Sequence, residues 1–244
     1  MRKIEVCCSS LAEAREAEAG GAVRIELCAA IACGGVTPSH ALIESVAKAD
    51  LALDVNVIIR PREGNFLYTE EEVDIMCRDI EFCREAGVHG VVIGALTADG
   101  NIDLEACRRM KNAAGEMSVT FHRAFDVCRA PQRALEQIIG LGCDRLLTSG
   151  LKPTAEAGAE LIAELVRQAD GRIIVMPGAG IRPSNIASIE RITRAEEFHS
   201  TARSCAPDGM SYRNPDVSFA VETDETIVRR TDRRVVSQLV NDAV

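Results

Sequence analysis

Short apolar runs alternate along the chain with segments in which apolar residues recur at spacings of three and four. The second pattern predicts amphipathic helices, and Leu42–Ala47, Val73–Ile80 and Leu161–Val166 show it most clearly. The short runs predict eight strands: Ile4–Cys7, Arg24–Cys28, Val55–Arg60, Gly90–Gly94, Val119–Arg123, Arg145–Ser149, Ile173–Met176 and Glu197–Ser200.

Signals for helix starts agree with this alternation. Ser10 with Glu13, and Thr69 with Glu72, have the spacing of capping boxes, and Asp103 is suited to cap a further helix. Strands and helices are therefore expected to alternate from one end of the chain to the other.

Eight such units fit either a closed barrel or an open, doubly wound sheet. In the first strand Lys3, Glu5 and Cys7 share one face, and Ile4 and Val6 the other. The same polar face recurs in four more strands: Arg24, Glu26 and Cys28; Asn56 and Arg60; Thr120 and His122; Glu197 and His199. Central strands of an open sheet are apolar on both faces, whereas one polar face suits a lumen that opens to solvent. We therefore expect one (β/α)8 barrel domain over residues 1–244, with five side chains inside: Glu5, Glu26, Asn56, His122 and His199.

Composition narrows the class of protein. Of the 244 residues 47% are hydrophobic, and the mean hydropathy is +0.03, so a sizeable core is expected. The net charge of −9 argues against a nucleic-acid surface, which needs a clustered basic footprint. No apolar run approaches the roughly 18 residues of a membrane helix, and residues 1–10 lack a signal-peptide core. A cytoplasmic protein without nucleic-acid or membrane partners is expected.

The ten cysteines are expected to be free thiols, because no export signal is present. No CxxC occurs, and Cys77 and Cys83 do not share a helix face, so a structural zinc site is not expected. We expect Cys77, Cys83, Cys107 and Cys143 to be core residues.

One connection breaks the regular pattern. Residues 200–222 show no periodicity before the last helical segment, Ile227–Leu239. Long aperiodic connections are usually functional or lie at an interface.

Several segments together resemble the CutC family. They are IEVCCSS at Ile4–Ser10, RIELC at Arg24–Cys28, GGVTPS at Gly34–Ser39, IIRPREGNFLY at Ile58–Tyr68, TFHRAFD at Thr120–Asp126, RLLTSG at Arg145–Gly150, PGAGI at Pro177–Ile181 and FHSTA at Phe198–Ala202. Asn65 and His89 stand where the family usually has Asp, and the tail beyond Asn214 matches loosely. The resemblance implies a (β/α)8 barrel, a cytoplasmic location, a homo-oligomer (dimer or tetramer) and an association with copper homeostasis.

Cys7 and Cys28 are the candidate metal ligands. They close neighbouring strands on the same lumenal face, whereas Cys8 points the other way. Two thiolates so placed suit one soft ion, and their softness favours Cu(I). The resemblance implies the same pair, because the copper-binding cysteines proposed for the family match these two positions. The alternative is that small thiols simply fill the barrel mouth.

Glu5 and Glu26 lie one step deeper on the same faces. Carboxylates are rarely buried without a partner, and Arg24, Lys3 and Arg60 are available. The two glutamates are therefore either part of a structural ion network or a catalytic acid/base pair.

The carboxyl ends of barrel strands also carry candidates for a small-molecule site, as barrel enzymes place their chemistry there. The candidates for binding an anion are Arg60, Arg62, Arg123, Gly178, Gly180 and His199. Two hypotheses remain open: a Cu(I)-binding protein that uses Cys7 and Cys28, or an enzyme acting on a small phosphorylated or carboxylated metabolite. Glu26 and His122 are the candidate proton-transfer residues of the second hypothesis.

Overall fold

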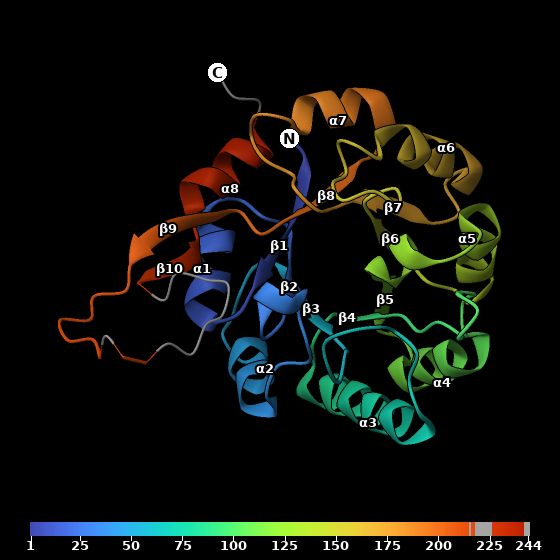
Figure 1. The fold of residues 1–244 in the computed structure, drawn as a ribbon, viewed down its shortest axis with the longest axis horizontal. Helices are drawn as coiled ribbons and strands as arrows, with labels where there is room; N and C mark the ends of the chain where they lie inside the picture. The colour runs from blue at the N-terminus through green and yellow to red at the C-terminus, as the bar shows by residue number, and fades with distance from the viewer. Residues whose placement is uncertain (215, 218–225, 242–244) are drawn as a thin grey trace.

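A parallel barrel forms the centre of the molecule (Figure 1), in a computed structural model that describes residues 1–214, 216–217 and 226–241. Its strands are β1 Lys3–Cys8, β2 Arg24–Leu27, β3 Asp54–Ile58, β4 Gly90–Ile93, β5 Ser118–Phe121, β6 Arg145–Thr148, β7 Ile174–Pro177 and β8 Glu197–Ser200. They are ordered β7-β6-β5-β4-β3-β2-β1-β8. Because β7 and β8 also contact one another, the barrel is nearly closed.

Helices surround the strands, as Figure 1 shows. They are α1 Leu11–Ala19, α2 His40–Ala47, α3 Glu70–Ala86, α4 Leu104–Ala114, α5 Pro131–Gly140, α6 Ala159–Ala169, α7 Ile186–Thr193 and α8 Arg233–Val240. Two short 3-10 turns, η1 Ile31–Cys33 and η2 Arg123–Val127, follow β2 and β5. The predicted (β/α)8 architecture is confirmed, with strand ends that differ by one or two residues.

The alternation of polar and apolar residues has the predicted result in space. Ile4, Val6, Ile25 and Leu27 are fully buried in the main core, where strands pack against helices. Inside the barrel a separate small cluster contains Cys7, Cys28, Ile58 and Val92. The five side chains expected inside are all buried polar groups: Glu5, Glu26, Asn56, His122 and His199. The lumen thus holds these polar groups beside one small apolar cluster, and the outer wall of the barrel is apolar.

Two of the three helix-start predictions are confirmed in full. Thr69 and Glu72 form a reciprocal capping box, and Asp103 caps α4. Ser10 caps α1 by accepting from the backbone N–H of Glu13, but the Glu13 carboxylate turns to the N–H and hydroxyl of Ser9. The predicted box at Ser10 is therefore only half formed, because Ser9 offers that carboxylate two donors.

All ten cysteines are free thiols, as predicted. Cys83, Cys107 and Cys143 are buried core residues, whereas Cys77 is only partly buried. Among the described residues, none of the helices combines the length and the apolar character that crossing a bilayer requires.

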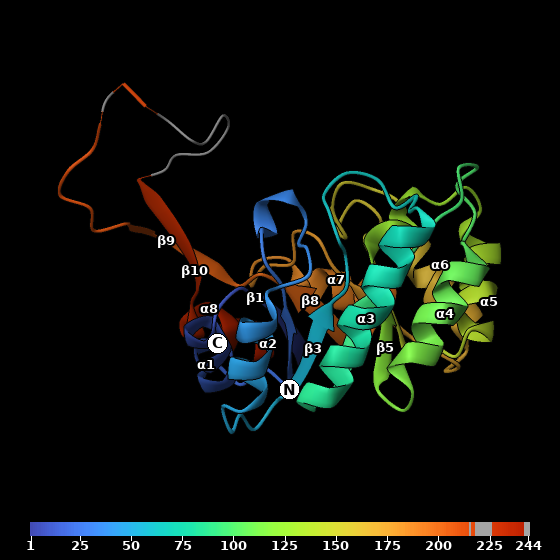
Figure 2. The ribbon, with the colours of Figure 1, turned by 90° about the horizontal axis from the view of Figure 1, so that it is seen from below.

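The connection after β8 is partly regular. β9 Arg203–Pro207 and β10 Ile227–Thr231 pair antiparallel and form a ribbon, here called the arm, that projects from the barrel (Figure 2). The connection expected to be irregular thus contains a strand at residues 203–207, while residues 215 and 218–222 lie outside the described part. The predicted helical segment Ile227–Leu239 is wrong for residues 227–231, which form β10, and right for the rest, where α8 begins at Arg233. Most arm residues are exposed, so neither strand has the alternating pattern that burial imposes.

Candidate functional site

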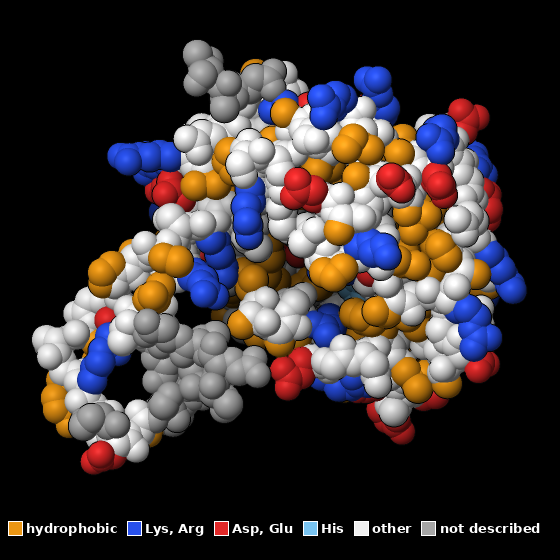
Figure 3. Space-filling model, turned by 45° about the horizontal axis from the view of Figure 1, so that its top comes forward, with side chains coloured by type: hydrophobic (Ala, Val, Ile, Leu, Met, Phe, Trp, Pro, Cys, Tyr) orange, Lys and Arg blue, Asp and Glu red, His pale blue; other side chains and the backbone are white. Residues whose placement is uncertain are grey.

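A cavity of about 930 Å³ opens at the carboxyl ends of the strands. The strands contribute Cys7, Glu26 and His199 to its lining, and the following loops contribute Arg123, Arg182 and Arg203, among others. Figure 3 shows the molecule hollowed near the middle of one face, with Lys or Arg side chains at the margin of the hollow. The cavity therefore combines a polar inner end with a cationic rim.

Beneath the cavity, an ion network fixes four strands together. Arg24 on β2 donates to Glu5 on β1 at 2.5 Å and to Glu197 on β8 at 2.6 Å. Arg145 on β6 adds a second bond to Glu197 at 2.8 Å. The side chains of Arg24, Glu5 and Glu197 are at most 4% exposed, so this network is the structural alternative foreseen for Glu5.

Glu5 also orients His199. The imidazole Nδ1 donates to Glu5 at 2.7 Å, which leaves Nε2 3.9 Å from a carboxylate oxygen of Glu26. Burial opposes ionisation of Glu5, but the hydrogen bond from His199 and the charge of Arg24 outweigh it and lower the pKa of Glu5 to about 2. Burial disfavours the imidazolium as well, yet the charge of Glu26, with Cys7 and Glu5, raises the pKa of His199 well above its ordinary value. A charged His199 therefore lies between two carboxyl groups.

Glu26 differs from Glu5 in that none of the described arginines is bonded to it. Its Oε1 is buried and has no hydrogen-bond partner among the described residues. Burial raises the pKa of Glu26; the charge of His199 acts against this shift, and that of Glu5 adds to it. Of the two, Glu26 is therefore the carboxyl group that takes up a proton more readily.

The two candidate metal-binding thiols lie side by side. Cys7 Sγ and Cys28 Sγ are 3.1 Å apart, both buried, at the carboxyl ends of β1 and β2. The contact with Cys28, together with burial, raises the pKa of the Cys7 thiol well above its ordinary value. Cys8 faces the other way and meets the Thr231 hydroxyl at 3.9 Å, as predicted from strand alternation.

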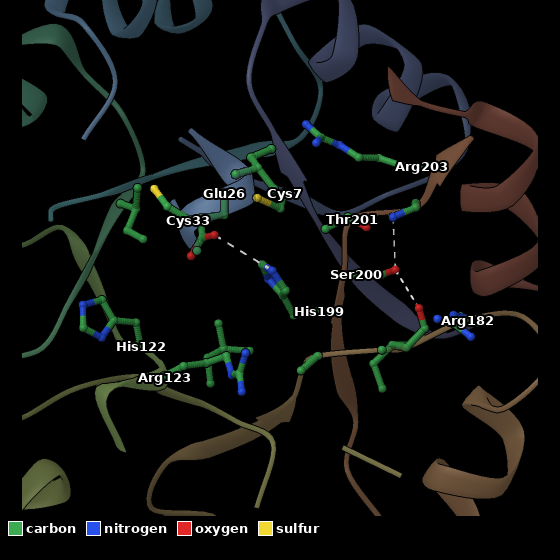
Figure 4. Close-up of a pocket in the computed structure, with 18 of the residues that line it drawn as sticks. Cys7, Glu26, Cys33, His122, Arg123, Arg182, His199, Ser200, Thr201 and Arg203 are labelled. Atoms are coloured by element: carbon green, nitrogen blue, oxygen red, sulfur yellow. Dashed lines mark hydrogen bonds and ion pairs between the residues drawn. The ribbon is translucent and has the colours of Figure 1, made fainter. Parts of the chain in front are cut away.

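His122 and His199 occupy different sides of the cavity and different electrostatic environments (Figure 4). His122 Nδ1 accepts from the N–H of Ala124 at 3.2 Å, so Nε2 carries the proton and finds no partner among the described residues. Burial, reinforced by the positive charge of Arg60, lowers the pKa of His122 to about 3. His122 is thus a neutral donor that lines the cavity, and no hydrogen bond joins it to Glu26 in the described part of the chain.

The arginines expected around the mouth differ in position and in hydrogen-bond partners. Arg60 lines the cavity, but its guanidinium donates to the carbonyls of Cys33, Gly35 and Gly64 at 2.8–2.9 Å, which holds two loops in place. Arg123 lines the cavity and pairs with Asp126 at 2.7 Å.

Arg62 is turned away from this mouth. It pairs with Glu72 at 2.5 Å and also donates to the carbonyl of Leu67. Contrary to expectation, Arg62 lies outside the cavity lining, because its guanidinium binds the carboxylate of Glu72 in the capping box of α3.

The two glycines after β7 also differ. Gly180 has φ +76° and lines the cavity. Gly178 does not line it; a Cβ there would come within 2.5 Å of Leu147 Cδ1, so close packing of β7 explains this glycine.

Among the lining residues that the sequence did not single out, three carry a charged or thiol side chain. Arg182 directly follows the PGAGI segment, so its place in the loop after β7 was a usable signal. Arg203 begins the arm and reaches back to Glu13 at 3.3 Å, and Cys33 lies in η1; neither has a sequence pattern that indicates a place in the cavity.

Three potential metal ligands converge at the inner end of the cavity. One ligand atom each from Cys7, Glu26 and His199 lies within 4.8 Å of the other two, and all three residues are buried. Figure 4 shows the three side chains directed toward one another, with Arg182 and Arg203 on the far side of His199 from His122. The arrangement is able to bind a metal ion, move a proton, or both.

Comparison with known proteins identifies the family of this chain and agrees with its barrel fold. The CutC family profile matches residues 2–204. A CutC family protein of Parabacteroides distasonis is 54% identical over 98% of this chain and 99% of its own, and one of Porphyromonas gingivalis W83 is 46% identical over 98% and 97%. The crystal structure of CutC from Streptococcus agalactiae, 32% identical, superposes with a TM-score of 0.79 over 82% of this chain and 99% of its own. The chain belongs to the CutC family.

Proposed function

We propose that this protein binds Cu(I) through Cys7 and Cys28 and serves copper homeostasis, the role named for the Streptococcus agalactiae structure. The observation that carries the proposal is the 3.1 Å separation of two buried thiols in an otherwise apolar cluster with Ile58 and Val92. Soft thiolates select Cu(I) over harder cations, and a two-coordinate site needs no further ligand. Cys7 lines the cavity, so its side chain is able to move apart from Cys28 to admit an ion between the sulfurs.

Proton release accompanies such binding. The raised pKa of Cys7 means that its thiol keeps its proton until the metal displaces it. Cu(I) affinity is therefore expected to increase with pH through the neutral range.

Anaerobic titration against a chromophoric Cu(I) chelator tests the proposal. The paired change Cys7→Ser with Cys28→Ser should abolish binding. The matched control, Cys77→Ser with Cys83→Ser, should bind like wild type, because those thiols lie on α3 outside the lumen. A Cys7/Cys28 double variant that titrates like wild type would refute the assignment.

A second candidate is an enzyme acting on a small phosphorylated or carboxylated metabolite. The observation that favours it is the size of the cavity together with three buried polar atoms on its lining that lack a partner among the described residues: Glu26 Oε1, Arg60 Nε and His122 Nε2. A single copper ion needs neither the volume nor these groups. In this function Glu26 transfers a proton, neutral His122 donates a hydrogen bond, and Arg123 with the Gly180 turn and His199 binds the anion.

Thermal stabilisation by inorganic phosphate and by a sugar phosphate tests the second candidate. Arg123→Ala should reduce the stabilisation, since one charge-assisted contact contributes roughly 1.5–3 kcal/mol, or about tenfold or more in affinity. Arg172→Ala is the control, because that arginine pairs with Glu136 on the outer helices. Equal stabilisation of wild type, Arg123→Ala and Arg172→Ala would refute an anion site at Arg123.

A cytoplasmic homo-oligomer, dimer or tetramer, completes the proposal. What supports association is the segment that follows β9 of the arm, in which Met210 is 65% and Tyr212 74% exposed. Where large exposed apolar side chains form a contiguous patch, they mark a contact surface. Light scattering should give a mass that is a multiple of 26.3 kDa at micromolar concentration, and a monomer would contradict the proposal.

A further inference from the structure

The lumenal groups beside the thiol pair form a second potential site with different chemistry. Cys7 on β1, Glu26 on β2 and His199 on β8 are each at most 9% exposed. Register brings them together: Cys7 pairs with Glu26 across β1 and β2, while Glu5, two residues before Cys7, pairs with His199 across β1 and β8. Their ligand atoms lie within 4.8 Å of one another, so the barrel itself assembles a sulfur, an oxygen and a nitrogen donor at one point.

The orientation of His199 is that of a metal ligand. Its Nδ1 donates to Glu5 at 2.7 Å, and Arg24 in turn holds Glu5. This fixes the ring so that Nε2 faces Glu26 and the cavity. A histidine ligand almost always donates its other N–H to a carboxylate or carbonyl, which sets the tautomer and the ring plane.

Glu26 provides an independent observation. It is 5% exposed, and its Oε1 is buried without a hydrogen-bond partner in the described part of the chain. Buried polar atoms are rarely left unpaired, because desolvation costs about 1–3 kcal/mol each. A metal ion bound here would satisfy this acceptor and would take the place of the proton on His199 Nε2, which is released on binding.

We propose that Cys7, Glu26 and His199 bind a divalent cation of borderline softness, with Zn²⁺ the best match, and leave one coordination position open to the cavity. The inference shares Cys7 with the proposed Cu(I) site and otherwise does not depend on it. Mixed sulfur, nitrogen and oxygen donors suit Zn²⁺, whereas Mg²⁺ and Ca²⁺ require oxygen and Cu(I) prefers sulfur alone. Zn²⁺ bonds of about 2.0–2.3 Å place tetrahedral ligand atoms about 3.3–3.8 Å apart, so shifts on the order of 1 Å complete the site.

The open position gives the site its chemical consequence. Three protein ligands and one exchangeable position are the arrangement of catalytic rather than structural zinc. Here that position faces the cavity, on whose lining Arg123, Arg182 and Arg203 lie. A water or a substrate oxygen bound there is polarised by the metal, and the arginines favour an anionic substrate.

Anaerobic titration of the purified protein with Zn²⁺ alone, in competition with a fluorescent chelator, tests the site. Wild type should bind one Zn²⁺ per chain. Glu26→Gln and His199→Gln, which preserve side-chain size, should each weaken binding by more than the roughly 10–100-fold that loss of an outer-shell partner costs. Cys77→Ser, the matched thiol control on α3, should bind like wild type.

Co²⁺ loading gives a second readout that a merely structural role would not produce. Wild type should show the sulfur-to-cobalt charge-transfer band and the intense visible bands of tetrahedral Co²⁺, and Glu26→Gln should lose the tetrahedral bands. Circular dichroism of each variant establishes that it is folded before titration. Zn²⁺ affinity unchanged in both lumenal variants, or no Zn²⁺ binding by wild type, would overturn the inference.

The two metals separate the two proposals. A wild-type protein that binds Zn²⁺ but not Cu(I) leaves the inference standing and removes the proposed Cu(I) function. The reverse result removes the inference and leaves the Cu(I) pair.

Discussion

Replacing Arg24 by Met tests whether the lumenal ion network stabilises the barrel. The change retains most of the apolar side chain and removes two charge-assisted bonds, to Glu5 at 2.5 Å and to Glu197 at 2.6 Å. At about 1.5–3 kcal/mol per bond, the gross loss is about 3–6 kcal/mol. Glu5 keeps His199 and Glu197 keeps Arg145, so neither carboxylate is left bare. Since breaking a buried pair costs about 3–5 kcal/mol, we expect a net loss of unfolding free energy in that range.

Urea unfolding followed by circular dichroism, with a chelator present, measures this loss. Arg24→Lys keeps the charge but not the two-pronged geometry and should be intermediate in stability. Arg172→Met is the matched control, because its pair with Glu136 is half exposed, and such surface pairs contribute little. If Arg24→Met lowers the free energy of unfolding no more than Arg172→Met does, the network does not hold the strands together.

The same variant has a defined pH dependence. The pKa of Glu5, about 2 when folded, lies below its ordinary value of 4.5. Its contribution to stability is therefore complete above pH 4.5 and is lost as the pH falls from 4.5 toward 2. The difference between wild type and Arg24→Met should be largest above pH 4.5 and shrink below it, and a difference that grows on acidification would contradict this assignment.

Two further changes test local parts of the fold, each by urea unfolding. Gly90→Ala places a Cβ within 2.5 Å of Asn56 Oδ1 and should cost about 1–3 kcal/mol, whereas Gly140→Ala, with nothing within 4 Å, should not destabilise; equal effects would contradict the packing described. Thr69→Ala removes the N-terminal cap of α3, which forms a capping box with Glu72, and should lower the free energy of unfolding by about 0.5–2 kcal/mol. Wild-type stability would mean that the cap contributes nothing.

Much of the barrel was predictable because side-chain direction alternates strictly along a strand. The alternation of Glu5 and Cys7 with Ile4 and Val6 assigned each to the lumen or the outer wall, and the structure agrees. The convergence of Cys7 and Cys28 followed in the same way, since both end neighbouring parallel strands. Positions set by period and strand order can be read from the chain alone.

Partners that depend on register or loop path could not be read in this way. His199 meets Glu5 only because β8 closes onto β1 with a particular register, which no local pattern encodes. Arg60 and Arg62 are two residues apart, yet one binds loop carbonyls and the other Glu72. A long side chain with several possible partners binds whichever partner the surrounding loops bring near it. The contacts of these two arginines therefore could not be predicted from the sequence.

The two histidines illustrate the same limit. Sequence reasoning placed both His122 and His199 at strand ends and favoured His122 for proton transfer. Their surroundings separate them: the pKa of His122 falls to about 3 through burial and Arg60, while that of His199 rises beside Glu26. Protonation state depends on neighbours from other strands, which a linear pattern does not contain.

X-ray absorption of the Cu(I)-loaded protein identifies the atoms that surround the bound ion. If Cys7 and Cys28 bind copper, the ion is two-coordinate with two sulfur neighbours, and Cys28→Ser loses one of them. A copper ion surrounded mainly by nitrogen or oxygen neighbours, or an unchanged spectrum in Cys28→Ser, would contradict this assignment.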